Sequence, residues 1–214
     1  MDAPSQEENN ELILQTEPST GSDEQLAREA QTGSLDCFEQ LVFRYERRVF
    51  AFISQFCPNA ADASELTQDT FLKAFRKIGQ YDSRRAFAPW LFTIARRNCI
   101  DRHRLAPPVA DAPLPEMVDD ATPSELIAQR EEGENLWRLA RERLGKTQFE
   151  ALWLHYAEQM EVAQIAQVLG KTRVHVKVLL FRARKNLADE LNRAHGSCRS
   201  YSEPAYAPSL PKLL

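Results

Sequence analysis

The chain has few of the residues that interrupt helices or build covalent and metal sites. Only seven of its 214 residues are glycine, and its cysteines (Cys37, Cys57, Cys99 and Cys198) are far apart, with no Cys-x-x-Cys pair. Neither a zinc site nor a disulfide framework is indicated, and we interpret these cysteines as buried free thiols. The scarcity of glycine and the long runs of 3.6-residue apolar periodicity predict an all-α protein.

Long apolar runs and catalytic motifs are also missing. No segment approaches the roughly 20 apolar residues that cross a bilayer, and the N-terminus lacks the basic-then-apolar order of a secretory signal. The four histidines are scattered and no glycine-rich phosphate loop occurs. We therefore expect a cytoplasmic protein without membrane insertion that is not an enzyme and has no catalytic residues, cofactor or metal.

Acidic segments that are poor in large apolar residues divide the chain. The first 24 residues hold seven Asp or Glu and no Lys or Arg, which predicts a disordered acidic leader over residues 1–22. A segment with five prolines, four acidic residues and no basic residue begins at position 105, which predicts a flexible linker over residues 105–122. Two small helical domains, over residues 23–104 and 123–193, and a loosely ordered tail over residues 194–214 complete the predicted organisation.

In the first domain, apolar periodicity predicts four helices. The first begins near Asp23, the second follows Gly33 and Ser34, and the third opens with Asp62 and Glu65 at capping-box spacing. A loop over Gly79–Arg85 leads to a last helix over Ala86–Arg104. The third helix is expected to turn the following residues inward: Leu66, Phe71, Ala74, Phe75 and Ile78.

In the second domain, Thr147 and Glu150 are expected to cap one helix, and a helix-turn-helix follows. Gly170 can leave the first helix of this pair at positive φ, and Thr172 can cap the second. Between Lys171 and Arg193 there are seven Lys or Arg against two acidic residues, in a chain of net charge −4. This contrast favours a polyanionic partner, although a basic helix can also be only a solvated surface. Four residues of the second helix are predicted to face the core: Val176, Leu180, Ala183 and Leu187.

Aromatic and basic residues alternate along the predicted helix at Ala86–Arg104. Six Arg and one Asp occur from Arg84 to Arg104. Aromatic faces stack on exposed bases while guanidinium groups follow phosphates, so the pattern is typical of a surface for opened DNA. For Trp90, the pattern leaves core packing and base contact both open.

Three passages in the same order resemble the bacterial extracytoplasmic-function (ECF) sigma factors, a family of RNA polymerase sigma factors. Residues 61–75 are similar to the polymerase-binding helix of this family, and residues 87–104 to its promoter-melting and minus-ten helix. Residues 164–184 resemble its minus-thirty-five reader. The resemblance covers about residues 23–192 and implies a polymerase subunit that binds core RNA polymerase and promoter DNA and promotes DNA opening. It also makes an anti-sigma protein a candidate partner.

The resemblance further implies three groups of contact residues. The polymerase-binding group is Asp62, Glu65, Leu66, Gln68, Asp69 and Phe71. The minus-ten and melting group, with a loop that holds an extruded base, is Tyr81, Arg84, Arg85, Trp90, Arg96, Arg97, Asn98 and Arg102. The helix-turn-helix group is Arg173, His175, Lys177, Arg182 and Arg184.

One departure from the family pattern lies in the DNA-reading helix. Many relatives carry Ser-Arg after the position of Lys177, whereas this chain has Val178 and Leu179. The second domain is therefore expected to read DNA weakly, to contact thymine methyls, or to face a protein. Two alternatives to a sigma factor also stay open, namely a conventional helix-turn-helix regulator that acts without being a polymerase subunit, and a pure interaction protein. Activity that depends on core polymerase would distinguish a sigma factor from a conventional regulator. DNA binding that is independent of salt, or absent, would indicate the interaction protein.

Overall fold

The computed structural model describes residues 21–57, 59–105 and 135–197, and within these ranges every regular element is helical. This confirms the predicted all-α class. Most of the predicted leader (residues 1–20), the predicted linker from residue 106 to residue 122, the start of the predicted second domain (residues 123–134) and the predicted tail from residue 198 lie outside the described residues. The elements, in chain order, are α1 (Asp23–Gln31), α2 (Leu35–Ser54), α3 (Ala60–Lys77), the 3-10 turn η1 (Ile78–Gln80), α4 (Phe87–Leu105), a helical stretch over 135–143, α6 (Lys146–Tyr156), α7 (Val162–Leu169) and α8 (Arg173–Ser197).

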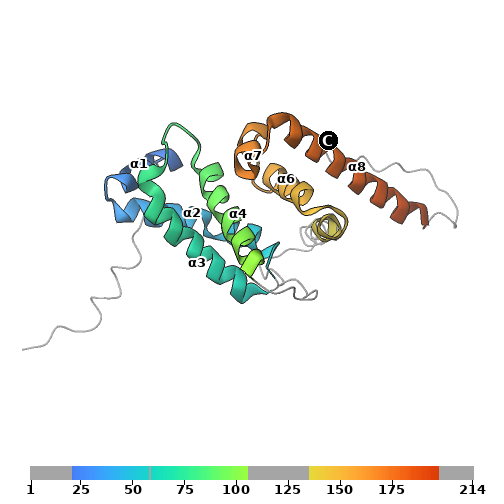
Figure 1. Ribbon diagram of the computed structural model, residues 1–214, viewed down its shortest axis with the longest axis horizontal. Coiled ribbons are helices and arrows are strands. Elements are labelled where there is room, and N and C mark those ends of the chain that lie inside the picture. Colours follow the sequence, from blue (N-terminus) through green and yellow to red (C-terminus); the bar gives the residue numbers. More distant parts are fainter. Residues whose placement is uncertain (1–20, 58, 106–134, 198–214) are drawn as a thin grey trace, which may run out of the picture.

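Helices α1 to α4 form the first module (Figure 1). Its core is built around the apolar stripe of α2. Leu41, Val49, Phe52 and Ile53 on this stripe are fully buried. Phe52 meets Phe92 of α4 edge-to-face, with ring centroids 5.4 Å apart. Burial of these large side chains stabilises the module and fixes the position of α4.

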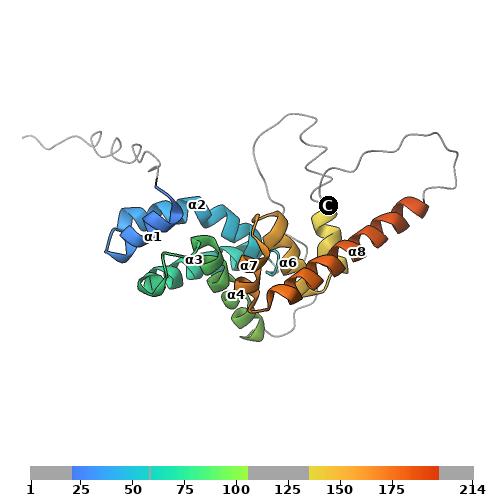
Figure 2. The ribbon, with the colours of Figure 1, turned by 90° about the horizontal axis from the view of Figure 1, so that it is seen from above.

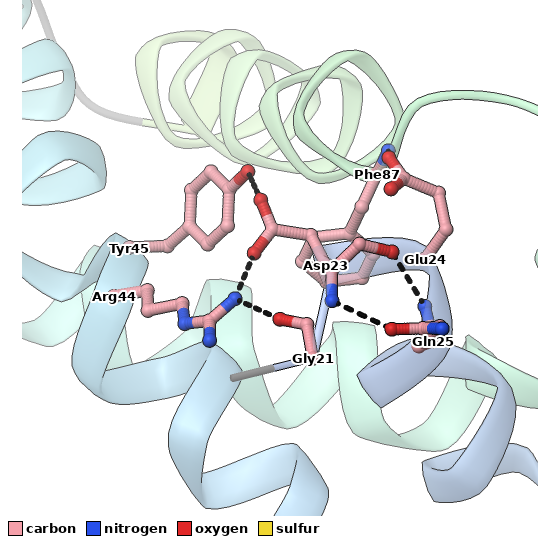
Figure 3. A network of polar contacts seen from close by, with 8 residues as sticks. Gly21, Asp23, Glu24, Gln25, Arg44, Tyr45 and Phe87 are labelled. Atoms are coloured by element: carbon pink, nitrogen blue, oxygen red, sulfur yellow. Dashed lines mark hydrogen bonds and ion pairs between the residues drawn. The ribbon is translucent and has the colours of Figure 1, made fainter. Parts of the chain in front are cut away.

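Acidic residues in the first turn of α1 join three helices of the first module (Figure 3). Asp23 accepts hydrogen bonds from the Arg44 guanidinium, at 2.7 Å, and from the Tyr45 hydroxyl. Glu24 accepts a hydrogen bond at 3.3 Å from the backbone N–H of Phe87, the first residue of α4. Because the first N–H groups of a helix have no intrahelical acceptor, Glu24 caps α4 from a distant part of the sequence.

The second module consists of the helical stretch 135–143, α6, α7 and α8. Its centre is an aromatic cluster in which the Trp137 ring lies 4.9 Å from Trp153 and 6.0 Å from Phe149, measured between centroids. Ile165 of α7 and Leu180 of α8 are almost fully buried. They belong to one hydrophobic cluster that also includes core residues of the first module, so the helix-turn-helix pair shares its core with that module.

The two modules touch each other, with α7 packed against α4 (Figures 1 and 2). Phe56, just after α2, meets Phe149 of α6 edge-to-face with centroids 6.1 Å apart. Lys146 Nζ lies 5.6 Å from the centre of the Phe56 ring. The sequence predicts two separately folded units and contains no signal for this contact.

Three details of the first and second modules differ from the sequence-based expectation. Asn59 and not Asp62 caps α3, because the Asn59 side chain accepts a hydrogen bond from the Asp62 N–H at 2.8 Å. Gly145 precedes α6 where Thr147 was expected to cap it, and the Gly145 N–H donates to Gln148 Oε1 at 3.3 Å. Phe75 keeps 46% of its surface exposed, since it lies on the same side of α3 as the exposed Leu72.

The cysteines in the described ranges are free and buried, as interpreted from the sequence. Burial raises the pKa of the Cys57 thiol to about 11 and that of Cys99 to about 12. Both therefore stay protonated at neutral pH, the form that is a poor nucleophile. Cys198 lies outside the described residues. None of the helices in the described ranges is both long enough and apolar enough to cross a membrane.

Candidate nucleic-acid interface

The turn between α7 and α8 has the geometry that its sequence predicts. Gly170 adopts the left-handed conformation at φ 62° and ends α7, and the Lys171 N–H then donates to Ala166 O at 3.0 Å. Thr172 Oγ1 accepts a hydrogen bond at 3.2 Å from the His175 N–H and so caps α8. A glycine at this position avoids the strain that a Cβ atom meets at positive φ, and the short turn sets the angle of α8 on α7.

Helix α8 separates its side chains into an inner and an outer face. All four residues that were expected to face the core are buried, and Leu179 joins them at 9% exposure. Four of the five predicted DNA contacts are exposed, namely Arg173, His175, Lys177 and Arg182. Arg184 is half-buried, and its Nε donates to the carbonyl of Leu180 at 3.2 Å. The outer face near the start of α8 is therefore cationic and accessible.

In the first module, Tyr81 holds the loop before α4 against the core. Its ring is 4% exposed and packs at 5.2 Å from Trp90 and 5.5 Å from Phe87, and its hydroxyl donates to the carbonyl of Arg85. Burial raises the pKa of the Tyr81 phenol. Tyr81 is thus a core residue that shapes the loop, whereas the family resemblance placed it among the DNA contacts.

Two arginines on this loop are open to solvent. The side chains of Arg84 and Arg85 are 89% and 67% exposed, and both approach the carboxylate of Asp82. Hydrogen bonds from Arg84 lower the pKa of that carboxyl, so Asp82 stays ionised. Because such an exposed pair is weak, phosphate can compete for either guanidinium.

The polar residues on α4 have different environments. Arg97 is exposed, whereas Asn98 is buried between α3 and α4. Its Nδ2 donates to Thr70 Oγ1 at 2.9 Å and its Oδ1 accepts from Lys73 Nζ at 2.7 Å. Asn98 therefore joins two helices, and only Arg97 of this pair is free to meet DNA in the described conformation.

Arg96 and Arg102 are both engaged in ion pairs. Arg96 Nε lies 3.0 Å from Glu150 Oε2 of α6, across the contact between the modules. An Arg102 nitrogen lies 2.7 Å from Asp62 Oδ1 and 3.1 Å from Glu65 Oε2. The structure thus joins a predicted melting residue to two predicted polymerase-binding residues, a relationship that the sequence does not reveal.

A cavity of about 290 Å³ lies beside Trp90 at the contact between the modules. Trp90 itself is half-buried, and it both packs against the core and lines this cavity. Lys77 and Arg97 place two cations at the cavity. An aromatic ring beside two cations has the chemistry that a base and its phosphate require. The lining residues are Lys77, Gln80, Trp90, Thr93, Ile94, Arg97 and Gln167.

On α3, the six residues predicted to bind polymerase do not all reach the surface. Leu66 and Phe71 are 4% and 8% exposed and belong to the core. Glu65 and Gln68 are exposed, and Asp62 and Asp69 are half-buried. Leu72 and Phe75, which the motif did not single out, are 54% and 46% exposed. Their spacing of four and seven residues from Gln68 places all three on one side of α3.

Comparison with protein families assigns both modules. The model for Sigma-70 region 2 matches residues 41–106, and the model for Sigma-70, region 4 matches residues 136–187. The chain is 31% identical over 169 residues to the ECF RNA polymerase sigma factor BldN of Streptomyces coelicolor, covering 77% of this chain and 64% of BldN. It is 28% identical over 175 residues to the RNA polymerase sigma-H factor of Pseudomonas aeruginosa, covering 76% of this chain and 90% of that protein.

Two solved structures share the fold. CnrH in complex with the cytosolic domain of CnrY is 23% identical, with a TM-score of 0.60 and coverage of 80% of this chain and 97% of that chain. The sigma factor RpoE in complex with the anti-sigma factor NepR from Bartonella quintana is 21% identical, with a TM-score of 0.56 and coverage of 72% and 96%. The two family models occur in order on the two modules, and the curated relatives extend across both. The chain therefore belongs to the ECF sigma factors of bacterial RNA polymerase.

Proposed function

We propose that this chain is a sigma subunit that binds core RNA polymerase in the cytoplasm, directs it to particular promoters and promotes opening of the DNA. The observation that carries the proposal is the combination of both sigma modules, in family order, with an exposed cationic face on α8. It acts as a binding and positioning subunit and is not itself an enzyme.

The exposed side of α3 is the proposed polymerase surface. Glu65, Gln68, Leu72 and Phe75 combine two polar groups with two exposed apolar side chains. Exposed apolar side chains beside polar ones are typical of a protein interface, because their burial on binding releases water. Leu66 and Phe71 support this surface from beneath.

The proposed promoter surface lies on both modules. Arg97 is exposed at the cavity beside Trp90, where an extruded base of the minus-ten element would stack, and Arg84 and Arg85 are exposed on the loop before α4. Helix α8 would enter the major groove of the minus-thirty-five element. These assignments follow the matched residues of the family, modified by what the structure shows to be buried.

A proteinaceous inhibitor is a further proposed partner. CnrH was solved with the cytosolic domain of CnrY, and RpoE with the anti-sigma factor NepR. The exposed apolar residues Leu72 and Phe75 would suit such a partner as well as polymerase. Competition between the two for α3 would keep the protein inactive.

Run-off transcription on a pool of genomic promoter fragments tests the proposal, with purified core polymerase in the presence and absence of this protein. New start sites that require both the protein and core are expected. Arg97→Ala should weaken them, and the matched control Arg28→Ala, an exposed arginine on α1, should not. Specific duplex binding without core, together with no new start sites, would instead indicate a conventional regulator.

A further inference from the structure

An apolar stripe runs along the outermost line of α8. Val174, Val178 and Phe181 are 72%, 40% and 66% exposed. Their spacing of four and three residues places them on one line of the helix, opposite the buried residues Val176 and Leu180. Three exposed positions on the side of α8 opposite its buried face are thus apolar, in a helix that was expected to present mainly cations.

Cations border this stripe on both sides. At 3.6 residues per turn, Lys177 lies on one flank and Arg182 on the other, and both are exposed. No acidic residue occurs anywhere from Val162 to Ala188. Among the described residues, none of the salt bridges involves Lys177 or Arg182. A partner that covers the stripe must therefore carry negative charge on both sides of an apolar centre.

Duplex DNA has this chemistry in its major groove. Two phosphate backbones border the groove, and the C5-methyl group of thymine is the apolar group exposed on its floor. A helix of α8 diameter fits between the backbones, so that flanking cations reach phosphates while the central line faces base edges. The stripe begins directly after the Thr172 cap, at the end of α8 that a helix-turn-helix inserts into the groove.

We propose that Val174, Val178 and Phe181 recognise thymine methyl groups in the upstream promoter element. This inference rests on the proposed function and names the base feature that the second module reads. Val178 has no hydrogen-bond donor, so at its position it discriminates by methyl contact and not by a hydrogen bond to a base edge. Leu179, its neighbour, is buried and contributes to the core instead.

Replacement of thymine by uracil removes only this methyl group and tests the proposal directly. Holoenzyme is assembled from core polymerase and the full chain, and its affinity is measured for a promoter taken from the run-off experiment. Uracil replaces thymine either within the footprinted upstream element or, as a control, in the spacer. Each contacted methyl that is lost should weaken binding by about fourfold, whereas spacer substitution should have no effect.

Variants of the stripe complete the experiment. Val178→Ser and Phe181→Ala alter exposed side chains, so the fold should be kept, as thermal unfolding would verify. Each variant should show a smaller preference for the thymine promoter over the uracil promoter than wild type does, because it removes one of the three proposed methyl contacts. The matched control Leu191→Ala, an exposed apolar residue farther along α8, should keep the wild-type preference for thymine.

Two results would overturn the proposal. Wild-type affinities for thymine and uracil promoters within about twofold of each other, with core-dependent transcription intact, would reject methyl recognition and leave the proposed function standing. If the stripe variants also matched wild type on DNA, the stripe would belong to a protein interface. A lack of core-dependent transcription would reject both the proposed function and this inference.

Discussion

Arg96 and Glu150 hold the two modules together through an ion pair with an Nε–Oε2 distance of 3.0 Å. The Glu150 side chain is 2% exposed and that of Arg96 is 18% exposed. Because Arg96 is on α4 and Glu150 on α6, the pair fastens the second module to the helix that resembles the melting helix of the family. A guanidinium in this position reaches a DNA phosphate only after the modules separate.

Removal of Arg96 should destabilise the protein more than removal of an ordinary surface arginine. Arg96→Ala leaves the Glu150 carboxylate buried without its partner, which typically costs about 3–5 kcal/mol. Urea unfolding would measure the loss, and the double variant Arg96→Met/Glu150→Leu should recover most of it, since neither residue then buries a charge. If the effects of the single variants Arg96→Met and Glu150→Leu added up strictly to that of the double variant, the ion pair would not couple the modules.

Arg97 and its neighbour Asn98 should respond in opposite ways to alanine substitution. Arg97→Ala changes an exposed side chain, so its unfolding free energy should stay within about 0.5 kcal/mol of wild type while promoter opening falls. Asn98→Ala removes the bonds to Thr70 and Lys73 and should cost about 1–3 kcal/mol. Paired denaturation and permanganate-footprinting measurements would test this, and a stable Asn98→Ala protein that cannot open promoters would contradict it.

A side chain at Gly170 should strain the turn of the helix-turn-helix. A Cβ atom at either Gly170 or Gly79 would meet no other atom within 4 Å, but only Gly170 has positive φ, at +62°. Gly170→Ala should therefore lose about 1–2 kcal/mol from backbone strain alone, while the matched change Gly79→Ala should not. Equal thermal midpoints for the two variants would show that the turn relaxes.

Glu158 should make stability fall as the pH rises from acid towards neutral. Burial raises the pKa of its carboxyl above the ordinary 4.5, against the opposing effect of Arg48, whose guanidinium is 2.8 Å away. The folded state then holds the proton more tightly than the unfolded state. Its stabilising contribution is therefore full below pH 4.5 and is lost as the pH rises through the folded-state pKa.

The variant Glu158→Gln should remove this dependence. Urea unfolding between pH 4 and neutrality should show a smaller loss of stability in Glu158→Gln than in wild type. Glu142→Gln, an exposed glutamate of the same module, should keep the wild-type slope. A steeper loss in Glu158→Gln would mean that the ion pair with Arg48 outweighs the burial.

Alanine substitutions of Leu66 and Leu72, six residues apart on α3, should have different effects, one on stability and the other on polymerase binding. Leu66→Ala empties a core position and should cost about 2–5 kcal/mol. Leu72→Ala should leave stability almost unchanged and weaken binding to core polymerase, because Leu72 is exposed on the proposed surface. Calorimetry and a core-binding titration would show both effects, and unaltered core affinity of Leu72→Ala would remove it from the interface.

The local features of this protein are the ones that its sequence predicts well. Gly170 and Thr172 specify the turn and the cap of α8 through backbone chemistry within a few residues, and the structure shows both. The exposed stripe was less visible, because the sequence pattern shows which residues face inward but does not rank the remaining ones by how far they project. Only the packed module separates Leu179, inside, from Val178, outside.

Contacts between residues that are far apart in the chain could not be predicted from the sequence. Arg96 and Glu150 are 54 positions apart and lie in different modules, so no periodicity connects them. A family motif also mixes residues that touch a partner with residues that support them. Tyr81, Asn98, Leu66 and Phe71 belong to such motifs and are buried, and burial depends on how α1, α3 and α4 meet.

Helices α3 and α4 are fastened to each other at two places along their length. Asn98 bridges Thr70 and Lys73 at one place, and Arg102 binds Asp62 and Glu65 at the other. Two separated attachments resist both sliding and rotation of one helix on the other. The two helices should therefore move as one rigid body. A protein that binds α3 would then also fix the position of α4 relative to the promoter DNA.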